Sequence, residues 1–218
     1  MNLFIPATCY PNDCFCESLK QGVLMQPVNA ISSLAYVFAG LWLLLKYPKL
    51  RKMPYAFFAF VFVLIGLSSF YYHAKFNLLG QVLDVGTMFL FVFGMILIWH
   101  KRSVRQGNIL LLYGVLAILV GVSVAVLVYF PLYRRILWGS VLLGVVFLEI
   151  RYQFAKRGSL NSYFKQGLII LLIGALMWVL DRYRIICFPD SILQLHSIWH
   201  IATAIAGYFL VLYYVEKV

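Results

Sequence analysis

Long apolar runs alternate with short polar connections through most of this chain. Seven of these runs are long enough to cross a hydrocarbon core, which takes about 20 helical residues. They cover residues 27–46, 54–72, 79–99, 109–128, 132–150, 166–186 and 191–214. The pattern predicts an all-α polytopic membrane protein with seven transmembrane helices.

The composition agrees with this pattern. Of the 218 residues, 64% are hydrophobic and only 11% are charged, a balance outside the range of soluble globular domains. No internal repeat or low-complexity segment divides the chain, so we expect residues 1–218 to form a single seven-helix domain. Residues 1–26 are a polar arm that lacks the basic head and continuous apolar run of a cleaved signal peptide.

Basic residues predict the orientation of the helices. Seven crossings place the termini on opposite sides of the membrane, and twelve of the 18 Lys and Arg residues lie on one of these sides. Because basic loops are retained in the cytoplasm, we predict an outer N-terminus and a cytoplasmic C-terminus. These loops and their contact with anionic headgroups explain the net charge of +11. We therefore expect no nucleic-acid partner. The expected partners are the membrane and a lipid substrate, and the sequence predicts no protein partner.

Polar side chains interrupt three of the apolar segments near the same predicted side of the membrane. Ser69 and His73 lie one helical turn apart at the outer end of the second segment. Asp84 follows at the start of the third, and His196 and His200 share one face of the seventh. An unpaired ionisable group in hydrocarbon costs several kcal/mol, so we expect these residues to form a site.

Three histidines and a carboxylate favour a catalytic zinc site. Zinc in hydrolases usually has three protein ligands and keeps a fourth position for water. We predict that His73, His196 and His200 are the ligands. Asp84 would then be the base that takes a proton from the water. The fourth histidine, His100, lies at the predicted cytoplasmic end of the third helix and is not expected to take part.

Two other functions could use the same polar groups. Histidines along a proton path would suit a transport protein and would need no metal. A serine nucleophile at Ser69 with His73 as its base is chemically feasible, but it leaves His196 and His200 without a role.

The four cysteines lie in two outer segments. Cys9, Cys14 and Cys16 belong to the arm, and Cys187 lies in the connection before the last helix. A disulfide between arm and connection fits an oxidising compartment, and free thiols fit a reducing one. The spacing of the cysteines does not distinguish the disulfide from the free thiols.

In combination, these residues resemble the alkaline ceramidases. That family belongs to a superfamily of seven-helix membrane hydrolases that also contains the progestin and adipoQ receptors. The likeness extends from about residue 14 to residue 214. It rests on Cys16-Glu17, Asn29-Ala-Ile-Ser-Ser, the spacing of Ser69 and His73, Gln81-Val-Leu-Asp84 and Gln194-Leu-His196-Ser-Ile-Trp199-His200.

The resemblance implies a zinc-dependent amidohydrolase that cleaves ceramide, or a related N-acyl lipid, to a sphingoid base and a fatty acid. It implies that zinc is bound by His73, His196 and His200. It also implies that Asp84 activates water and that Ser69 stabilises the oxyanion formed on the amide carbonyl. The alternative within the superfamily is a zinc membrane receptor of the adipoQ type without efficient amidase activity.

The resemblance also has implications for the outer arm and for the location of the protein. The family pattern implies a disulfide between Cys16 and Cys187. The calcium-binding arm of the family is reduced here to Asp13 and Glu17, and two carboxylates without a full oxygen cage make a weak Ca²⁺ site, so we do not expect tight calcium binding. The short loops favour a bacterial inner membrane or, in a eukaryote, the ER or Golgi membrane.

Overall fold

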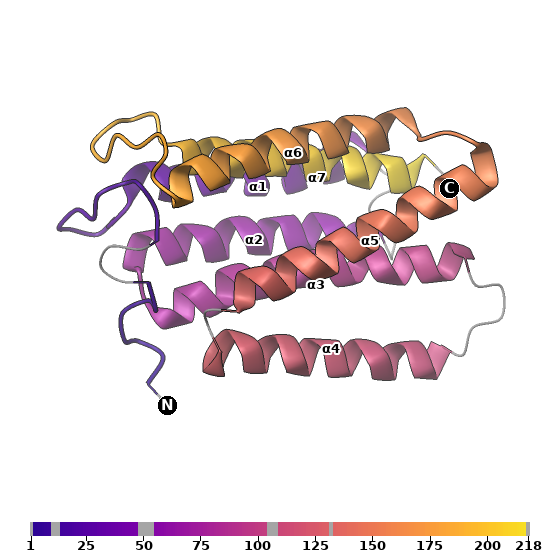
Figure 1. The fold of residues 1–218 in the computed structure, drawn as a ribbon, viewed down its shortest axis with the longest axis horizontal. Helices are drawn as coiled ribbons and strands as arrows, with labels where there is room; N and C mark the ends of the chain where they lie inside the picture. The colour runs from indigo at the N-terminus through magenta and orange to yellow at the C-terminus, as the bar shows by residue number, and fades with distance from the viewer. Residues whose placement is uncertain (1, 10–13, 48–54, 104–108, 131–132, 217–218) are drawn as a thin grey trace. The chain divides into compact units, whose positions relative to one another are not determined.

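The computed structural model describes residues 2–9, 14–47, 55–103, 109–130 and 133–216. In these residues it contains seven α-helices and no β-structure other than an isolated bridge between Pro6 and Asn77. The helices are α1 (Pro27–Lys46), α2 (Tyr55–Lys75), α3 (Leu78–Ser103), α4 (Ile109–Tyr129), α5 (Arg134–Arg157), α6 (Ser162–Arg182) and α7 (Leu195–Val215) (Figure 1). The predicted all-α class is confirmed.

The helices have the length and composition of membrane spans. Every helix except α4 is long and apolar enough to cross a bilayer, as judged from the described residues. The described side chains of α4 add a shorter apolar stretch, Ala117–Tyr129. A polytopic membrane protein was therefore predicted correctly, while the orientation of the two termini stays a prediction.

Two parts of the chain are each compact. Residues 1–84 and 162–218 form the first part, and residues 85–161 form the second. In the first part α7 packs against α6 and α1, and α1 packs against α2. In the second part α4 packs against α5, and Arg102 forms an ion pair with the buried Glu149. All predicted site residues that the structure describes belong to the first part, and the expectation of a single domain stays a prediction.

Helices α1 and α2 approach each other closely at two glycines. A Cβ atom on Gly40 would lie 2.6 Å from the carbonyl oxygen of Ala59, and one on Gly66 would lie 2.6 Å from a methyl group of Val37. Small residues at such crossings let membrane helices pack backbone to backbone. The close approach allows polar side chains of the two helices to meet.

The junction between α2 and α3 is tighter than the sequence predicts. Helix α2 continues to Lys75, so that His73 lies inside the helix. Only Phe76 and Asn77 separate it from α3, and the Asn77 side chain caps α3 by accepting the N–H of Gly80 at 2.8 Å. Capping by Asn satisfies one of the free N–H groups at a helix start.

Two other helix ends differ from the predicted segments because hydropathy marks the hydrocarbon core and not the end of the helix. Helix α5 continues past residue 150 through a charged turn to Arg157 and stops at Gly158, which has φ 70°, the left-handed conformation that glycine favours. Helix α6 ends at Arg182, although apolar residues continue, and Arg184 has φ 53° in the following turn.

Candidate metal centre

Three buried histidines from two helices converge in the first part of the chain. His73 comes from α2, and His196 and His200 come from α7. Their ring centroids are 4.5 to 5.2 Å apart, and one ligand nitrogen of each lies within 4.8 Å of the others. The side chains are between 0% and 4% exposed. The group could hold a metal ion, and His100 is not a member of it.

The start of α7 is fixed by side chains on either side of it. The side-chain amide of Gln194 donates hydrogen bonds to the carbonyl oxygens of Phe188 and Ser191 at 2.9 and 2.8 Å. These bonds hold the end of the α6–α7 connection directly before the helix, which begins at Leu195. The carboxylate of Asp181 in α6 accepts the backbone N–H of His196 at 3.3 Å. These contacts set the rotation of α7 and therefore the direction of its two histidines.

The side chain of Gln26 determines which nitrogen of His73 is available. The Gln26 amide donates to the carbonyl oxygen of Glu17 at 2.8 Å, so its own oxygen faces Nδ1 of His73, also at 2.8 Å. Nδ1 must therefore carry the proton, and Nε2 has a free electron pair. Nε2 is buried and has no hydrogen-bond partner among the described residues. An orphaned imidazole nitrogen that faces two further histidines fits a metal ligand.

His200 is oriented in the same way by α1. Its Nδ1 lies 2.9 Å from Oγ of Ser32, and that hydroxyl donates to the carbonyl oxygen of Asn29 at 3.0 Å. Since the serine proton is used, the serine oxygen accepts from Nδ1–H, and Nε2 of His200 is the nitrogen that can bind a metal. Two of the three rings are thus held in the tautomer that metal binding requires.

Ser69 lies beside this network. It is 2% exposed, and its Oγ lies 3.1 Å from that of Ser33, whose hydroxyl also donates to the carbonyl oxygen of Asn29 at 2.8 Å. Ser33 also lies 3.4 Å from Nδ1 of His200. Helix α1 therefore connects the predicted oxyanion donor on α2 to a histidine on α7.

Asp84 lies in the second turn of α3 and is half-buried. It is not a member of the ligand group, and it interacts electrostatically with Tyr36 of α1. The Tyr36 hydroxyl forms a short hydrogen bond with Thr203, and its ring centroid is 6.4 Å from that of His200. Tyr36 is therefore a neighbour of both the acid and His200.

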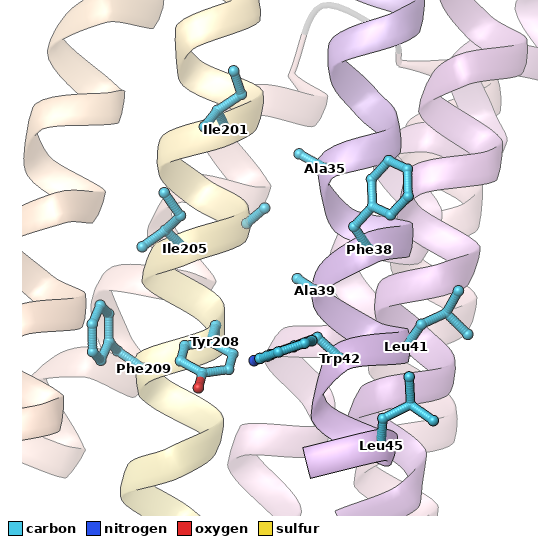
Figure 2. Close-up of a pocket in the computed structure, with 11 residues that line it drawn as sticks. Ala35, Phe38, Ala39, Leu41, Trp42, Leu45, Ile201, Ile205, Tyr208 and Phe209 are labelled. Carbon is cyan, nitrogen blue, oxygen red and sulfur yellow. The ribbon is translucent and has the colours of Figure 1, made fainter.

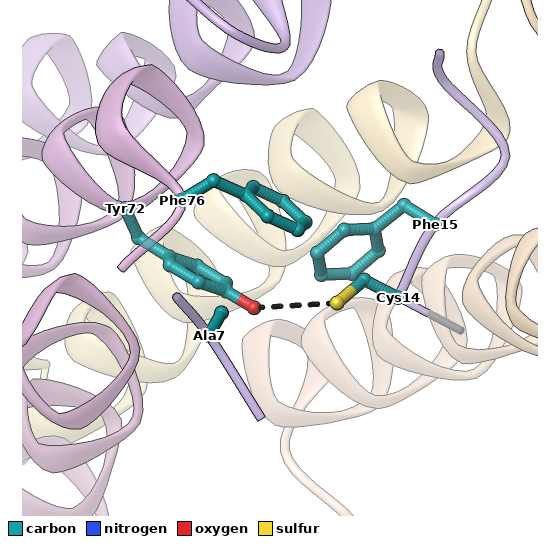
Figure 3. Close-up of a cluster of buried hydrophobic side chains, with 5 residues drawn as sticks. All are labelled: Ala7, Cys14, Phe15, Tyr72 and Phe76. Atoms are coloured by element: carbon teal, nitrogen blue, oxygen red, sulfur yellow. Dashed lines mark hydrogen bonds between the residues drawn. The ribbon is translucent and has the colours of Figure 1, made fainter. Parts of the chain in front are cut away.

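Phe15 of the arm covers the histidines. Its ring centroid is 4.0 Å from that of His196 and 4.9 Å from that of His73. Figure 3 shows Phe15 in a buried cluster with Tyr72 and Phe76. A cavity of about 410 Å³ borders Phe15 and Gln26 along the arm, and both side chains also contact His73. They separate this cavity from the three rings.

Glu17 is committed to the helix start and is not part of the metal group. Its two carboxylate oxygens accept the N–H groups of Val28 and Asn29 at 2.8 and 2.9 Å. Burial raises the pKa of Glu17, and the hydrogen bonds from Asn29 and Val28 oppose that shift. Asp13, the other residue of the expected weak calcium site, lies outside the described residues, so calcium binding stays a prediction.

The arm contains two disulfides, one of which attaches it to the connection before α7. Cys16 and Cys187 are bonded, with their Cα atoms 5.4 Å apart, and Cys9 is bonded to Cys14. The first pair is the one that the family resemblance implies. The N–H of Cys16 also donates to Asp181 at 3.1 Å, so that one carboxylate joins the arm to the start of α7.

Four residues of this site were missed by the sequence analysis: Gln26, Phe15, Tyr36 and Asp181. A signal existed for Asp181, because an acid inside the apolar segment 166–186 satisfies the criterion that singled out Asp84. The other three have residue types that are common in membrane helices and arms, and nothing in their spacing indicates a contact with a histidine.

Comparison with known proteins decides the family. A family model described as Ceramidase matches residues 15–216, which include the histidine group, Ser69 and Asp84. This chain belongs to the ceramidase family. The resemblance found in its residues is confirmed.

Two relatives of this ceramidase-family protein are similar over most of their length. Human alkaline ceramidase 1 is 26% identical over 204 residues, which cover 88% of this chain and 76% of the relative. Mouse alkaline ceramidase 1 is 24% identical over 205 residues, which cover 88% and 74%. The family match begins within the arm, at residue 15, and includes all the helices that carry the site.

Proposed function

We propose that this ceramidase-family protein is a zinc-dependent intramembrane amidohydrolase that cleaves ceramide, or a closely related N-acyl lipid, to a sphingoid base and a fatty acid. The observation that carries the proposal is the convergence of three buried imidazoles, two of which are held with Nδ1 protonated. Neutral imidazole nitrogens without a carboxylate suit zinc better than magnesium or calcium. The names of the relatives support ceramide as the substrate class.

His73, His196 and His200 would hold the ion. When bound, zinc would polarise the amide carbonyl and lower the pKa of water in the site. Gln26 and Ser32 keep the ring nitrogens directed inward. Phe15 limits the access of bulk water from the arm, so that one ordered water can be positioned for attack.

Asp84 and Ser69 would carry the protons and the charge of the reaction. Asp84 accepts a proton from the attacking water while the oxygen adds to the carbonyl carbon. Ser69 lies within hydrogen-bond distance of Ser33 and would turn its hydroxyl proton from Ser33 to the oxyanion as the charge develops. Asp84 then returns the proton to the amide nitrogen as the C–N bond breaks, which releases the amine and leaves the fatty acid.

The membrane supplies the substrate. With the orientation predicted from basic loops, the site lies at the outer leaflet of a bacterial inner membrane, or at the lumenal leaflet of an ER or Golgi membrane. A substrate with two hydrocarbon chains can present its amide there while its chains stay in the bilayer.

A set of three variants tests the proposal. Purified wild-type protein should contain about one zinc per chain and release fatty acid from a labelled ceramide. His196→Ala should lose both the metal and the hydrolysis, and Asp84→Asn should keep the metal while its rate falls by about 10² to 10⁴. The matched control is His100→Ala, which removes a histidine outside the group.

Metal analysis and turnover together separate the alternatives. Full hydrolysis by His196→Ala would exclude the zinc mechanism. Wild-type protein that binds zinc but cleaves none of a panel of lipid amides would instead support the receptor-like alternative. Protein without bound metal, and with the same stability in a chelator, would support a proton path.

A further inference from the structure

An open groove runs along the surface between α1 and α7, and none of the three histidines lines it. Its volume is about 650 Å³. Phe38, Trp42 and Leu45 of α1 line one side, and Ile201, Ile205 and Phe209 of α7 line the other. Figure 2 shows alanines on the floor of the groove, where larger side chains would fill it. The lining is almost entirely apolar, which suits a hydrocarbon chain.

One end of the groove has the polar groups that a lipid headgroup needs. Trp42 and Tyr208 lie there (Figure 2), and the hydroxyl groups of Tyr208 and Tyr47 are 3.2 Å apart. The ammonium group of Lys46 lies 5.6 Å from the Trp42 ring and 5.7 Å from the Tyr47 ring. Trp, Tyr and Lys in this combination mark a membrane interface.

Lys46 is available to an anion from outside the protein. Its side chain is exposed, and no described acidic side chain lies within ion-pair distance of it. The hydrogen bond between the two tyrosine hydroxyls uses one of their protons, and the other is a donor next to this charge. Ceramide carries no anionic group, so this end of the groove is complementary to a phosphate and not to the proposed substrate.

The length of the groove corresponds to one leaflet. From Ala35 to Leu45 the helix rises by about 15 Å, which is half of a hydrocarbon core about 30 Å thick. The apolar end of the groove lies next to the hydrogen bond between Ser32 and His200, one turn along each helix from Ala35 and Ala204.

We propose that the groove between α1 and α7 binds one anionic phospholipid from the leaflet at the Lys46 end. An acyl chain lies along the alanine floor, and the phosphate is bound by Lys46 and by the hydroxyl proton of the Tyr47–Tyr208 pair that is not used between them. The lipid bridges the two helices that carry Ser32 and His200. This site is separate from the proposed amidase site and does not depend on the identity of the substrate.

Quenching of Trp42 fluorescence by brominated lipid chains tests the proposal. Protein is reconstituted into phosphatidylcholine vesicles that contain a small fraction of phosphatidylglycerol with brominated chains. The part of the quenching that disappears in Trp42→Phe reports on the groove. We expect brominated phosphatidylglycerol to bind about fivefold more tightly than brominated phosphatidylcholine, from about 1 kcal/mol for one basic residue at the membrane surface.

Two pairs of variants make the test specific. Lys46→Gln should remove the fivefold preference, and Lys156→Gln, at an exposed lysine of α5, should retain it. Ala39→Phe should fill the floor and abolish the Trp42 component, whereas Ala117→Phe, at an exposed alanine of α4, should not. Lys46→Gln removes the charge but changes none of the side chains that line the groove, and therefore serves as the test if Ala39→Phe does not fold.

The opposite results would overturn the proposal. Equal quenching by the two brominated lipids would show ordinary annular lipid only. A preference for phosphatidylglycerol that survives Lys46→Gln would place the anionic lipid elsewhere. Neither result would bear on zinc content or amide hydrolysis, so this inference and the proposed function fail independently.

Discussion

At the scale of single residues, the candidate metal centre depends on hydrogen bonds that leave one imidazole nitrogen free. Gln26 accepts a hydrogen bond from Nδ1 of His73, and Ser32 accepts one from Nδ1 of His200. Gln26 and Ser32 each donate in turn to a backbone carbonyl oxygen. The backbone contact therefore determines that the histidine is the donor in each of these hydrogen bonds. A polar residue that binds no metal can therefore control how well a metal binds.

Removal of the Gln26 side chain should weaken metal binding. In Gln26→Ala the Nδ1 proton of His73 loses its acceptor, and the ring can rotate or change tautomer. Loss of such an outer partner typically costs 10- to 100-fold in metal affinity, and we expect a change of that size in chelator competition. The exposed Gln166 of α6 gives the matched control, Gln166→Ala, and an equal loss in both variants would contradict the positioning role.

Glu17 should make stability depend on pH in a direction set by its burial. Because burial raises its pKa, the folded protein holds the Glu17 proton at a pH where the unfolded chain has released it. The contribution of this group is therefore fully present below the ordinary glutamate pKa of about 4.3 and is lost as the pH rises through the higher folded value.

Thermal denaturation across this pH range measures the effect. The Tm of the wild type should fall relative to that of Glu17→Gln as the pH rises above about 4.3. The exposed Glu216 provides the control variant Glu216→Gln. A Tm difference between wild type and Glu17→Gln that stays constant with pH would show that burial does not shift this carboxyl.

At the scale of the elements, α1 is the helix that connects the parts of the site. It carries Ser32 and Ser33 toward α7 and α2, and its N-terminus follows Gln26 directly. Its position against α2 depends on the missing side chain of Gly40, where the Ala59 carbonyl oxygen occupies the space of a Cβ atom. Helix packing and site geometry are therefore coupled through one contact.

A methyl group at Gly40 should separate α1 from α2. We expect Gly40→Ala to destabilise the protein by about 1–3 kcal/mol through overpacking and to weaken metal binding, because Ser33 and Ser69 move apart. Gly139→Ala in α5 is the matched control, since nothing lies within 4 Å of the added Cβ and alanine is the better helix former. Denaturant unfolding and chelator competition measure both effects, and a neutral Gly40→Ala would contradict this account.

At the scale of the whole chain, residues far apart in sequence are tied together by the arm. The Cys16–Cys187 disulfide joins positions 171 residues apart, whereas Cys9–Cys14 closes a separation of only 5. Lys20 of the arm also pairs with Asp190 in the same connection, and this ion pair, together with the Ser18 hydrogen bond, lowers the pKa of Asp190. The arm is thus fixed to the connection that starts α7.

The two disulfides should differ in their effect on stability. In the chain-entropy model the long closure contributes about 5 kcal/mol and the short one about 2 kcal/mol. We expect Cys16→Ser with Cys187→Ser to lower Tm more than Cys9→Ser with Cys14→Ser, and to weaken metal binding because Asp181 loses its ordered partner Cys16. Equal Tm losses in the two double variants would contradict the assignment of the long link as the main constraint.

The helices, the membrane character and the histidine pair of α7 were determined by the sequence alone. In hydrocarbon every backbone N–H and C=O group must be paired within its own segment, so apolar length is enough to predict a helix. The contact of His196 with His200 is equally local, because residues four apart share a helix face. The family followed from these motifs in combination.

The sequence also predicted that His73 joins this pair, but only the tertiary structure decided that Gln26 and Ser32 select the ring tautomers and that Phe15 covers the rings. These contacts join segments separated by tens to more than a hundred residues. They depend on how closely α1 passes α2 and on the rotation of α7, which a hydropathy pattern does not encode because it records burial and not the identity of the neighbour.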